Sequence, residues 1–180
     1  MNKPLFQPLR TNAGAGFQLD HRIVLAPLTR NRATEPNMCP HQLHVDYYSS
    51  RATHNGLLIT EATNISPEAV GYPSVPGLWT LEQADCWRKV TDAVHAKGGR
   101  IFCQLWHTGR IAQPSFGEHP FLNGSSIKPS VSASNVRMTH PRTKKPLSAM
   151  TYQGREDCAI PRALRTGELP RLIENYRHGT

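Results

Sequence analysis

The stretch Arg100–Arg110 reads RIFCQLWHTGR and joins an apolar run directly to polar and aromatic side chains. Ile101–Cys103 has the character of a buried strand, and no turn residue separates it from Gln104, Trp106 and His107. A buried amide has to be hydrogen-bonded, and a planar, polar ligand is one partner that satisfies it. The stretch therefore predicts a strand whose carboxyl end faces a binding site.

Two earlier segments also predict strands. Arg22–Pro27 (RIVLAP) is a continuous apolar run, which is typical of a strand covered on both faces of a parallel sheet. Leu57–Glu61, within GLLITEAT, is the second of these strands. Before them, Gly14 and Gly16 separate two short strand-like runs within residues 5–22, which predicts a hairpin.

Helical patterns lie between the strands. Residues 40–53 predict a helix with Pro40 in its first turn and with Leu43 and Tyr47 on one face. Thr80 and Gln83 have the spacing of a capping box that begins a second helix. The apolar residues of this second helix repeat at helical spacing and stop at a glycine pair: Ala84, Trp87, Val90, Val94 and Gly98-Gly99.

Residues 106–165 are rich in proline, serine and glycine and show no clear periodicity. Such a length far exceeds an ordinary connection, so we expect a functional loop or an insertion with its own small hairpin. Thr166 is predicted to cap a last helix. The apolar face of that helix comprises Leu169, Leu172, Ile173 and Tyr176.

Repeated βα units predict an α/β fold with a parallel sheet and right-handed crossovers. No G-x-G-x-x-G follows any strand, which argues against a dinucleotide-binding Rossmann domain. In a barrel of βα units the site lies at the carboxyl ends of the strands. Thr29, Ala62 and Gln104 stand near the ends of three consecutive predicted strands, so they should share one rim.

Composition limits the partners. Lys and Arg number 21 against 13 Asp and Glu, a net charge of +8, which suits an anionic partner. No run of five basic residues exists, so we expect no nucleic-acid partner. We also expect no membrane association, because the chain has no leader-like start and no apolar run of membrane-spanning length. Four scattered cysteines indicate free thiols in a reducing compartment, so a cytoplasmic protein is expected.

A metal site is not expected. Cys39, His41 and His44 imitate the spacing of metal ligands, but no second ligand cluster accompanies them, and both histidines read as a helix surface. Glu61 and His95 have no partner that the sequence reveals.

Five segments in order, APLTRNR, GLLITEAT, GYPSVPGLWT, VHAKGGRIFCQLWHTGR and PRALRTGELP, resemble the old yellow enzyme family of flavin-dependent ene-reductases. The 12-oxophytodienoate-reductase-like branch is the most similar, and the resemblance runs from about residue 5 to residue 177. It implies part of a (β/α)8 TIM barrel: an N-terminal hairpin, about three βα units and a long loop after the third strand. It also implies FMN at the strand ends, with NADPH as reductant and an enone or enal as substrate.

The resemblance assigns cofactor-binding residues one by one. Pro27, Leu28 and Thr29 match the segment that lies along the flavin ring, with the Thr29 hydroxyl bonded to the flavin carbonyl O4. Ala62 matches a small residue beside the flavin, where a larger side chain would collide with it. Gln104 matches the amide that bonds the pyrimidine edge.

The resemblance also places Trp106 on the substrate side and Tyr72 in a loop near the pocket. Each assignment has a structural alternative. Thr29 is also a plausible turn cap, and Trp106 a core residue. His107 is expected to be a hydrogen-bonded structural histidine. Three arginines are expected to form salt bridges: Arg30, Arg32 and Arg110.

Length sets the expected limit on activity. A barrel of this type needs about 250 residues or more. The resemblance places a substrate-binding His-x-x-His or His-x-x-Asn pair on the next strand and a proton-donating tyrosine shortly after it. Residues 1–180 are therefore expected to be the N-terminal portion of one truncated domain, inactive alone. The sequence leaves three origins of this truncation open: a truncated gene model, a splice or pseudogene product, and one half of a split enzyme. The alternative is a non-catalytic half-barrel that binds the missing C-terminal half or a homologue.

Overall fold

The computed structural model describes residues 3–12, 16–118 and 131–179. Its strands are β1 (Leu9–Arg10), β2 (Gln18–Leu19), β3 (Val24–Leu25), β4 (Leu57–Asn64), β5 (Arg100–Trp106), β6 (Val131–Ser132), β7 (Ser148–Thr151), β8 (Gly154–Asp157) and β9 (Arg162–Ala163). Its helices are α1 (Gln42–Ser49), α2 (Leu81–His95) and α3 (Leu169–His178). No helix among the described residues has the length and apolar character needed to cross a bilayer.

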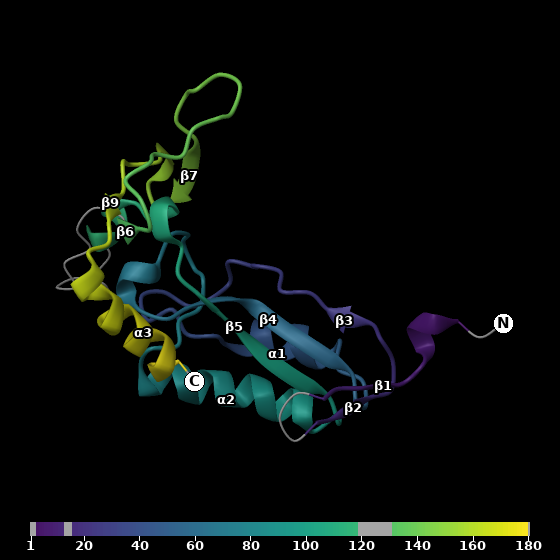
Figure 1. Ribbon diagram of the computed structural model, residues 1–180. Helices are drawn as coiled ribbons and strands as arrows, with labels where there is room; N and C mark the ends of the chain where they lie inside the picture. Colours follow the sequence, from purple (N-terminus) through teal and green to yellow (C-terminus); the bar gives the residue numbers. More distant parts are fainter. Residues whose placement is uncertain (1–2, 13–15, 119–130, 180) are drawn as a thin grey trace.

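The centre of the molecule is a parallel three-stranded sheet in the order β3-β4-β5, with α1 and α2 as its crossovers (Figure 1). The predicted βαβαβ order is therefore confirmed, although β3 is shorter than expected and β4 is longer. In the ranges that the structure describes, the sheet stays open and does not close into a barrel.

The two helices cover one face of this sheet. Tyr48 of α1, Leu58 of β4 and Trp87 of α2 are buried together. Val90 and Val94 complete the same cluster from α2, with no exposed surface. Burial of this apolar area drives the packing of α1 and α2 on the sheet.

Local signals define α2 well. The Thr80 hydroxyl accepts a hydrogen bond from the Gln83 N–H at 3.2 Å, and the Gln83 amide oxygen accepts from the Thr80 N–H at 3.2 Å. This is the predicted capping box. Beyond the helix, Gly98 adopts φ +72°, a left-handed conformation that glycine takes without a steric penalty.

The prediction that the first strand, β3, is covered on both faces is wrong, and so is the prediction that Ile101–Cys103 of β5 is buried. Phe102 of β5 is 52% exposed, and Val24 of β3 and Cys103 of β5 are exposed as well. The physical reason is that α1 and α2 cover a single face of the sheet. In addition, β5 has one neighbouring strand among the described residues, so it forms an edge.

The predicted face of α1 is also wrong. The helix begins at Gln42, after Pro40, and His41 is its N-cap residue. Leu43 is 55% exposed, whereas His44 and Tyr48 are buried. The buried face is displaced by one position, about 100° around the helix, because Tyr48 packs into the core against β4 and α2.

The terminal regions hold shorter elements. Strands β1 and β2 form the predicted antiparallel hairpin; Gly16 has φ +63°, and Gly14 lies outside the described residues. Within the long segment after β5, strands β7 and β8 form the expected small hairpin, and β6 pairs with β9. Residues 119–130 of this segment lie outside the description.

The C-terminal end of the last helix, α3, lies near the start of α2 (Figure 1), where Asn175 and His178 line a cavity together with Leu81 and Ala84. A 3-10 turn at Thr166–Glu168 precedes it, and its N-cap residue is Glu168 rather than the predicted Thr166. The helix contains the apolar residues that the sequence predicted for one face. Three of them, Leu169, Ile173 and Tyr176, are nevertheless exposed. Contacts with the described part of the chain therefore leave most of this face uncovered.

Candidate functional site

The carboxyl ends of β3, β4 and β5 form one rim, because the three strands are parallel and adjacent. Ala62 of β4 lies directly opposite Gln104 of β5 in the register of the sheet. The segment Pro27–Thr29 leaves the end of β3, the strand on the other side of β4. The structure thus brings the predicted cofactor-binding positions to neighbouring strand ends.

The rim residues differ in exposure. Leu28 is 55% exposed, and Thr29 and Gln104 are exposed as well. Between them, Ala62 is buried and has no side chain beyond its Cβ. A hydroxyl and an amide therefore flank a small residue, a donor and acceptor set that suits the carbonyl and N–H edge of a flat heterocycle. The residues present thus fit a flavin ring, and their contact with it stays a prediction.

A β-bulge lies in β4 just before the rim. Ile59 pairs with Phe102, and Ala62 then pairs with Gln104, so one extra residue of β4 lies between these pairs. Thr60 of the bulge accepts a hydrogen bond from the Gln104 N–H at 3.0 Å through its hydroxyl oxygen. The same hydroxyl donates to the Glu61 carbonyl oxygen at 2.8 Å.

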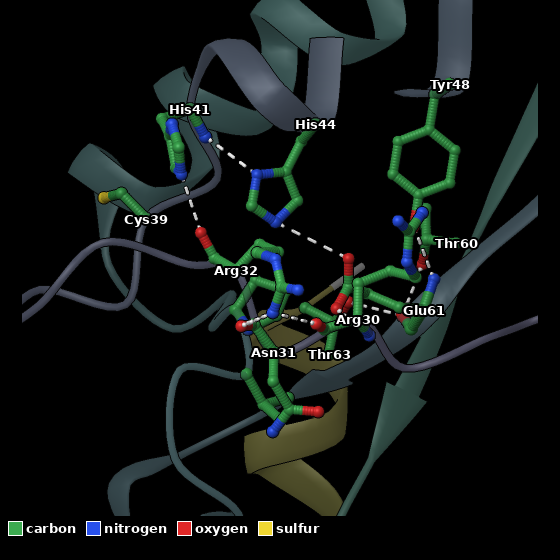
Figure 2. A network of polar contacts seen from close by, with 12 residues as sticks. Arg30, Asn31, Arg32, Cys39, His41, His44, Tyr48, Thr60, Glu61 and Thr63 are labelled. Atoms are coloured by element: carbon green, nitrogen blue, oxygen red, sulfur yellow. Dashed lines mark hydrogen bonds and ion pairs between the residues drawn. The ribbon is translucent and has the colours of Figure 1, made fainter. Parts of the chain in front are cut away.

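The second residue of the bulge, Glu61, is the centre of a buried polar network (Figure 2). It is 1% exposed, and its carboxylate accepts from the backbone N–H of Arg30 at 3.0 Å. Its own N–H donates to the Tyr48 hydroxyl oxygen at 2.7 Å. Burial raises the pKa of the Glu61 carboxyl, although the Arg30 N–H and the Arg30 charge oppose that shift.

His44 faces the same carboxylate from α1, with its Nε2 atom 3.5 Å from Glu61 Oε1. The Nδ1 atom of His44 accepts from the His41 N–H at 3.1 Å, so the neutral ring carries its proton on Nε2. Burial lowers the pKa of His44 to about 4, so the ring is neutral at pH 7.

Sequence reasoning missed this network. His44 was expected on a helix surface and Glu61 without a partner; the structure buries both and places them together. The available signal was the spacing of His44 and Tyr48, which stand four residues apart and share one helix face. Their partner lies on β4, at a distance along the chain that no local pattern covers.

A cavity of about 160 Å³ lies beside the network and is lined by Arg30, Arg32, Leu43, His44, Tyr47 and Glu61. The Arg30 guanidinium stacks on the Tyr47 ring, 3.7 Å from its centroid. Arg32 donates to the carbonyl oxygens of Arg30 and Asn31 at 3.1 and 3.0 Å.

Among the described residues, Arg30 and Arg32 thus contact an aromatic ring and carbonyl oxygens in place of the carboxylates expected from the sequence. Arg110 likewise donates to the Val136 carbonyl oxygen at 2.9 Å and to the Ser134 hydroxyl at 3.2 Å. Guanidinium groups that bind carbonyl oxygens cross-link loops without needing a carboxylate.

The two residues predicted to contact substrate lie together. The rings of Tyr72 and Trp106 are stacked, with centroids 5.7 Å apart and an angle of 17° between their planes. Both side chains are half-buried. Next to Trp106, the Nδ1 atom of His107 accepts from the Gly109 N–H at 2.9 Å, which supports the structural role expected for this histidine. Burial lowers the pKa of His107.

Two further observations concern metals and thiols. Among residues 3–12, 16–118 and 131–179, no three His, Cys, Asp or Glu side chains are grouped to hold a metal ion. Cys39, Cys86, Cys103 and Cys158 are free thiols.

Comparison with known proteins relates this geometry to a family. The family model described as NADH:flavin oxidoreductase / NADH oxidase matches residues 4–178. A putative 12-oxophytodienoate reductase 11 of Oryza sativa subsp. japonica is 40% identical over 178 residues, which is 97% of this chain and 42% of the relative. A flavin oxidoreductase of Emericella nidulans is 53% identical over 117 residues, 63% of this chain and 29% of that protein.

Solved structures give the same result. The old yellow enzyme homologue from Zymomonas mobilis superposes with a TM-score of 0.82 at 37% identity, covering 98% of this chain and 44% of that one. Morphinone reductase in complex with tetrahydroNAD superposes with a TM-score of 0.80 at 38% identity, covering 99% of this chain and 45% of that one. The chain thus spans less than half the length of these relatives.

Proposed function

Because the chain belongs to the NADH:flavin oxidoreductase / NADH oxidase family, we propose that its rim supplies one edge of the FMN site of an NADPH-dependent ene-reductase. The observation that carries this proposal is the pairing of Ala62 with Gln104, with the Pro27–Thr29 segment at the adjacent strand end. A flat cofactor laid across these strand ends meets a hydroxyl, a small residue and an amide in turn.

Each rim residue has a proposed task. The Thr29 hydroxyl donates to the flavin carbonyl O4 and withdraws electron density from the ring. The Gln104 amide donates and accepts in the plane of the pyrimidine edge. Ala62 leaves room for the ring, and Pro27 and Leu28 lie along it. FMN, when bound, supplies the hydride transfer; the residues of this chain hold and orient the ring.

The stacked pair of Tyr72 and Trp106 is proposed as a wall of the substrate site. A flat aromatic wall suits a planar conjugated substrate, so we propose the C=C bond of an α,β-unsaturated carbonyl compound as the reacting group. Support comes from the 12-oxophytodienoate reductases among the relatives. The proposed nicotinamide reductant is supported by the morphinone reductase structure that contains tetrahydroNAD.

The test is a chimera. Residues 1–180 are joined to the corresponding C-terminal half of the Zymomonas mobilis homologue, and the purified protein is examined for bound flavin and for NADPH-dependent reduction of a simple cyclic enone. We expect the chimera to be yellow. In the chimera, Gln104→Ala should weaken FMN binding by about tenfold, because the substitution removes two amide hydrogen bonds. Gln18→Ala, at an exposed position of β2, is the control. A folded chimera that binds no flavin would refute the proposal.

A second function, assembly with a complementary chain, is favoured by the exposed apolar side chains. Phe102 and Val24 lie on the uncovered part of the sheet, and Ile173 lies on α3. Apolar surface of this kind is typical of an interface. Sedimentation of this chain with a separately expressed C-terminal half should show a 1:1 complex; two independent species would count against assembly.

A further inference from the structure

We propose that the bulge residues Thr60 and Glu61 are positioning residues that hold the two halves of the rim in register. Thr60 holds Gln104 on one side, and Glu61 holds the Thr29–Arg30 peptide on the other. This inference rests on the proposed flavin site, because it assigns a purpose to the spacing of Thr29 and Gln104. It concerns groups that do not themselves touch the cofactor.

The contact toward β5 is direct. The Thr60 hydroxyl oxygen accepts from the backbone N–H of Gln104 at 3.0 Å, and its proton is donated to the Glu61 carbonyl oxygen at 2.8 Å. The hydroxyl therefore bridges two strands at the point where the regular ladder is interrupted. Thr60 is 2% exposed, so water does not compete for either bond.

The contact toward β3 acts on the peptide that follows Thr29. Glu61 Oε2 accepts from the Arg30 N–H at 3.0 Å, which fixes the plane of the Thr29–Arg30 peptide. The next residue, Asn31, has φ +53° and donates from its side chain to the Pro73 carbonyl oxygen at 2.6 Å. The chain is thus held on both sides of Arg30, and Thr29 is held with it.

Helix α1 supports Glu61 through His44 and Tyr48, whose side chains point toward it in Figure 2. The Tyr48 hydroxyl accepts from the Glu61 N–H at 2.7 Å, and the protonated Nε2 of His44 faces Oε1 at 3.5 Å. The Arg30 guanidinium lines the same cavity as this carboxylate, and it stacks on Tyr47. Through Glu61, α1 and the hydrophobic core around Tyr48 therefore hold the rim in position.

The bulge explains how two consecutive residues serve both neighbouring strands. In a regular strand, consecutive side chains point to opposite faces, and the backbone alone bonds to the neighbours. The extra residue turns the Thr60 and Glu61 side chains toward backbone N–H groups of β5 and of the segment after β3. Bulges commonly lie beside active sites, where they redirect side chains. A carboxyl that is 1% exposed is costly to bury, which is consistent with a specific use.

Amide hydrogen exchange of the whole chain, read residue by residue by NMR, tests both arms. In Thr60→Val the Gln104 amide should exchange about tenfold faster while the Arg30 amide keeps its rate. In Glu61→Leu the Arg30 amide should exchange faster while the Gln104 amide keeps its rate. Thr60→Ser and Glu61→Gln retain an acceptor oxygen and should restore protection. Should Glu61→Leu fail to fold, Tyr48→Phe loosens the same residue, and exchange of the Arg30 amide should then rise more than exchange of the Val90 amide in the core.

The outcomes separate this inference from the proposed function. Faster exchange confined to the one predicted amide in each variant supports the inference. Unchanged exchange at Gln104 and Arg30 would overturn it, and so would an equal rise at Val90 in the core, because that shows only general destabilisation. Titration of the same samples with FMN tests the flavin site by itself: if the wild type binds no FMN, the proposed function fails, whatever the exchange rates show.

Discussion

The rings of Tyr72 and Trp106 stack with their centroids 5.7 Å apart and their planes 17° from parallel. Tyr72 belongs to the loop after β4, and Trp106 is the last residue of β5, so the stack joins this loop to the rim. Two residues selected from the sequence for one purpose thus form one surface in the fold.

Removing that stack should loosen the loop. Tyr72→Ala is expected to lower the free energy of unfolding by about 1 to 2 kcal/mol, because it removes an aromatic pair and half-buried surface. Tyr72→Phe keeps the ring and should lie within about 0.5 kcal/mol of the wild type. Urea unfolding measures both values; equal losses in the two variants would mean that the hydroxyl, rather than the stack, stabilises the loop.

Loss of the Tyr48 hydroxyl should be costly. Tyr48→Phe leaves the buried N–H of Glu61 without its acceptor, now 2.7 Å away, and should destabilise the protein by about 1 to 3 kcal/mol. Tyr47→Phe is the matched control on the same helix, because it keeps the ring on which Arg30 and Arg51 stack. Its unfolding curve should overlay that of the wild type. A harmless Tyr48→Phe would mean that water satisfies Glu61.

His44 should make stability depend on pH. Burial lowers its pKa from 6.5 to about 4, so below pH 6.5 the unfolded chain takes up a proton that the folded protein does not bind. Its contribution is therefore fully present above pH 6.5 and is lost as the pH falls to about 4, a difference of roughly 3 kcal/mol. The Glu61 carboxyl acts in the opposite direction, because its raised pKa favours the folded state as the pH falls toward 4.5.

The variant His44→Gln separates the two contributions. It should remove the acid-side loss between pH 6.5 and 4, so its stability falls less than that of the wild type over this range. His95→Gln, at an exposed position in the last turn of α2, is the control and should follow the wild-type curve. Parallel pH curves for the wild type and His44→Gln would show that His44 is not the titrating group.

Gly77 should not tolerate a side chain. A Cβ at this position would collide with the Trp79 ring and lie 2.5 Å from the Gln83 amide nitrogen, within the capping region of α2. Gly77→Ala should therefore cost about 1 to 3 kcal/mol. Gly167→Ala is the control, because a Cβ placed there has no heavy atom of the described residues within 4 Å apart from its chain neighbours. A Gly77→Ala protein as stable as Gly167→Ala would mean that the cap rearranges without cost.

Local patterns in the sequence were sufficient for much of the fold. The capping box of Thr80 and Gln83 and the stop at Gly98 defined α2, because caps depend on residues three or four positions apart. The parallel order of the strands followed from the alternation of strand and helix patterns. The shared rim then followed from the direction of the strands, which placed Ala62 and Gln104 at one edge.

Tertiary features were beyond such patterns. The bulge at Thr60 and Glu61 has no local signature, since its bonds go to Gln104 and Arg30 on other segments. The apolar pair Leu43 and Tyr47 suggested the wrong face of α1, because the core is formed by Tyr48 with residues of β4 and α2. The exposure of Phe102 depends on which elements cover the sheet, and its apolar character does not determine that.

The central claim is that Thr29, Ala62 and Gln104 form one flavin-binding edge. The most direct measurement is a titration of the isotope-labelled chain with FMN, followed by amide NMR. We expect the amides of these three residues to shift together, with a weak saturable affinity, and the shifts to disappear in Gln104→Ala. Shifts confined to other surfaces, or no shift at millimolar FMN, would contradict the claim.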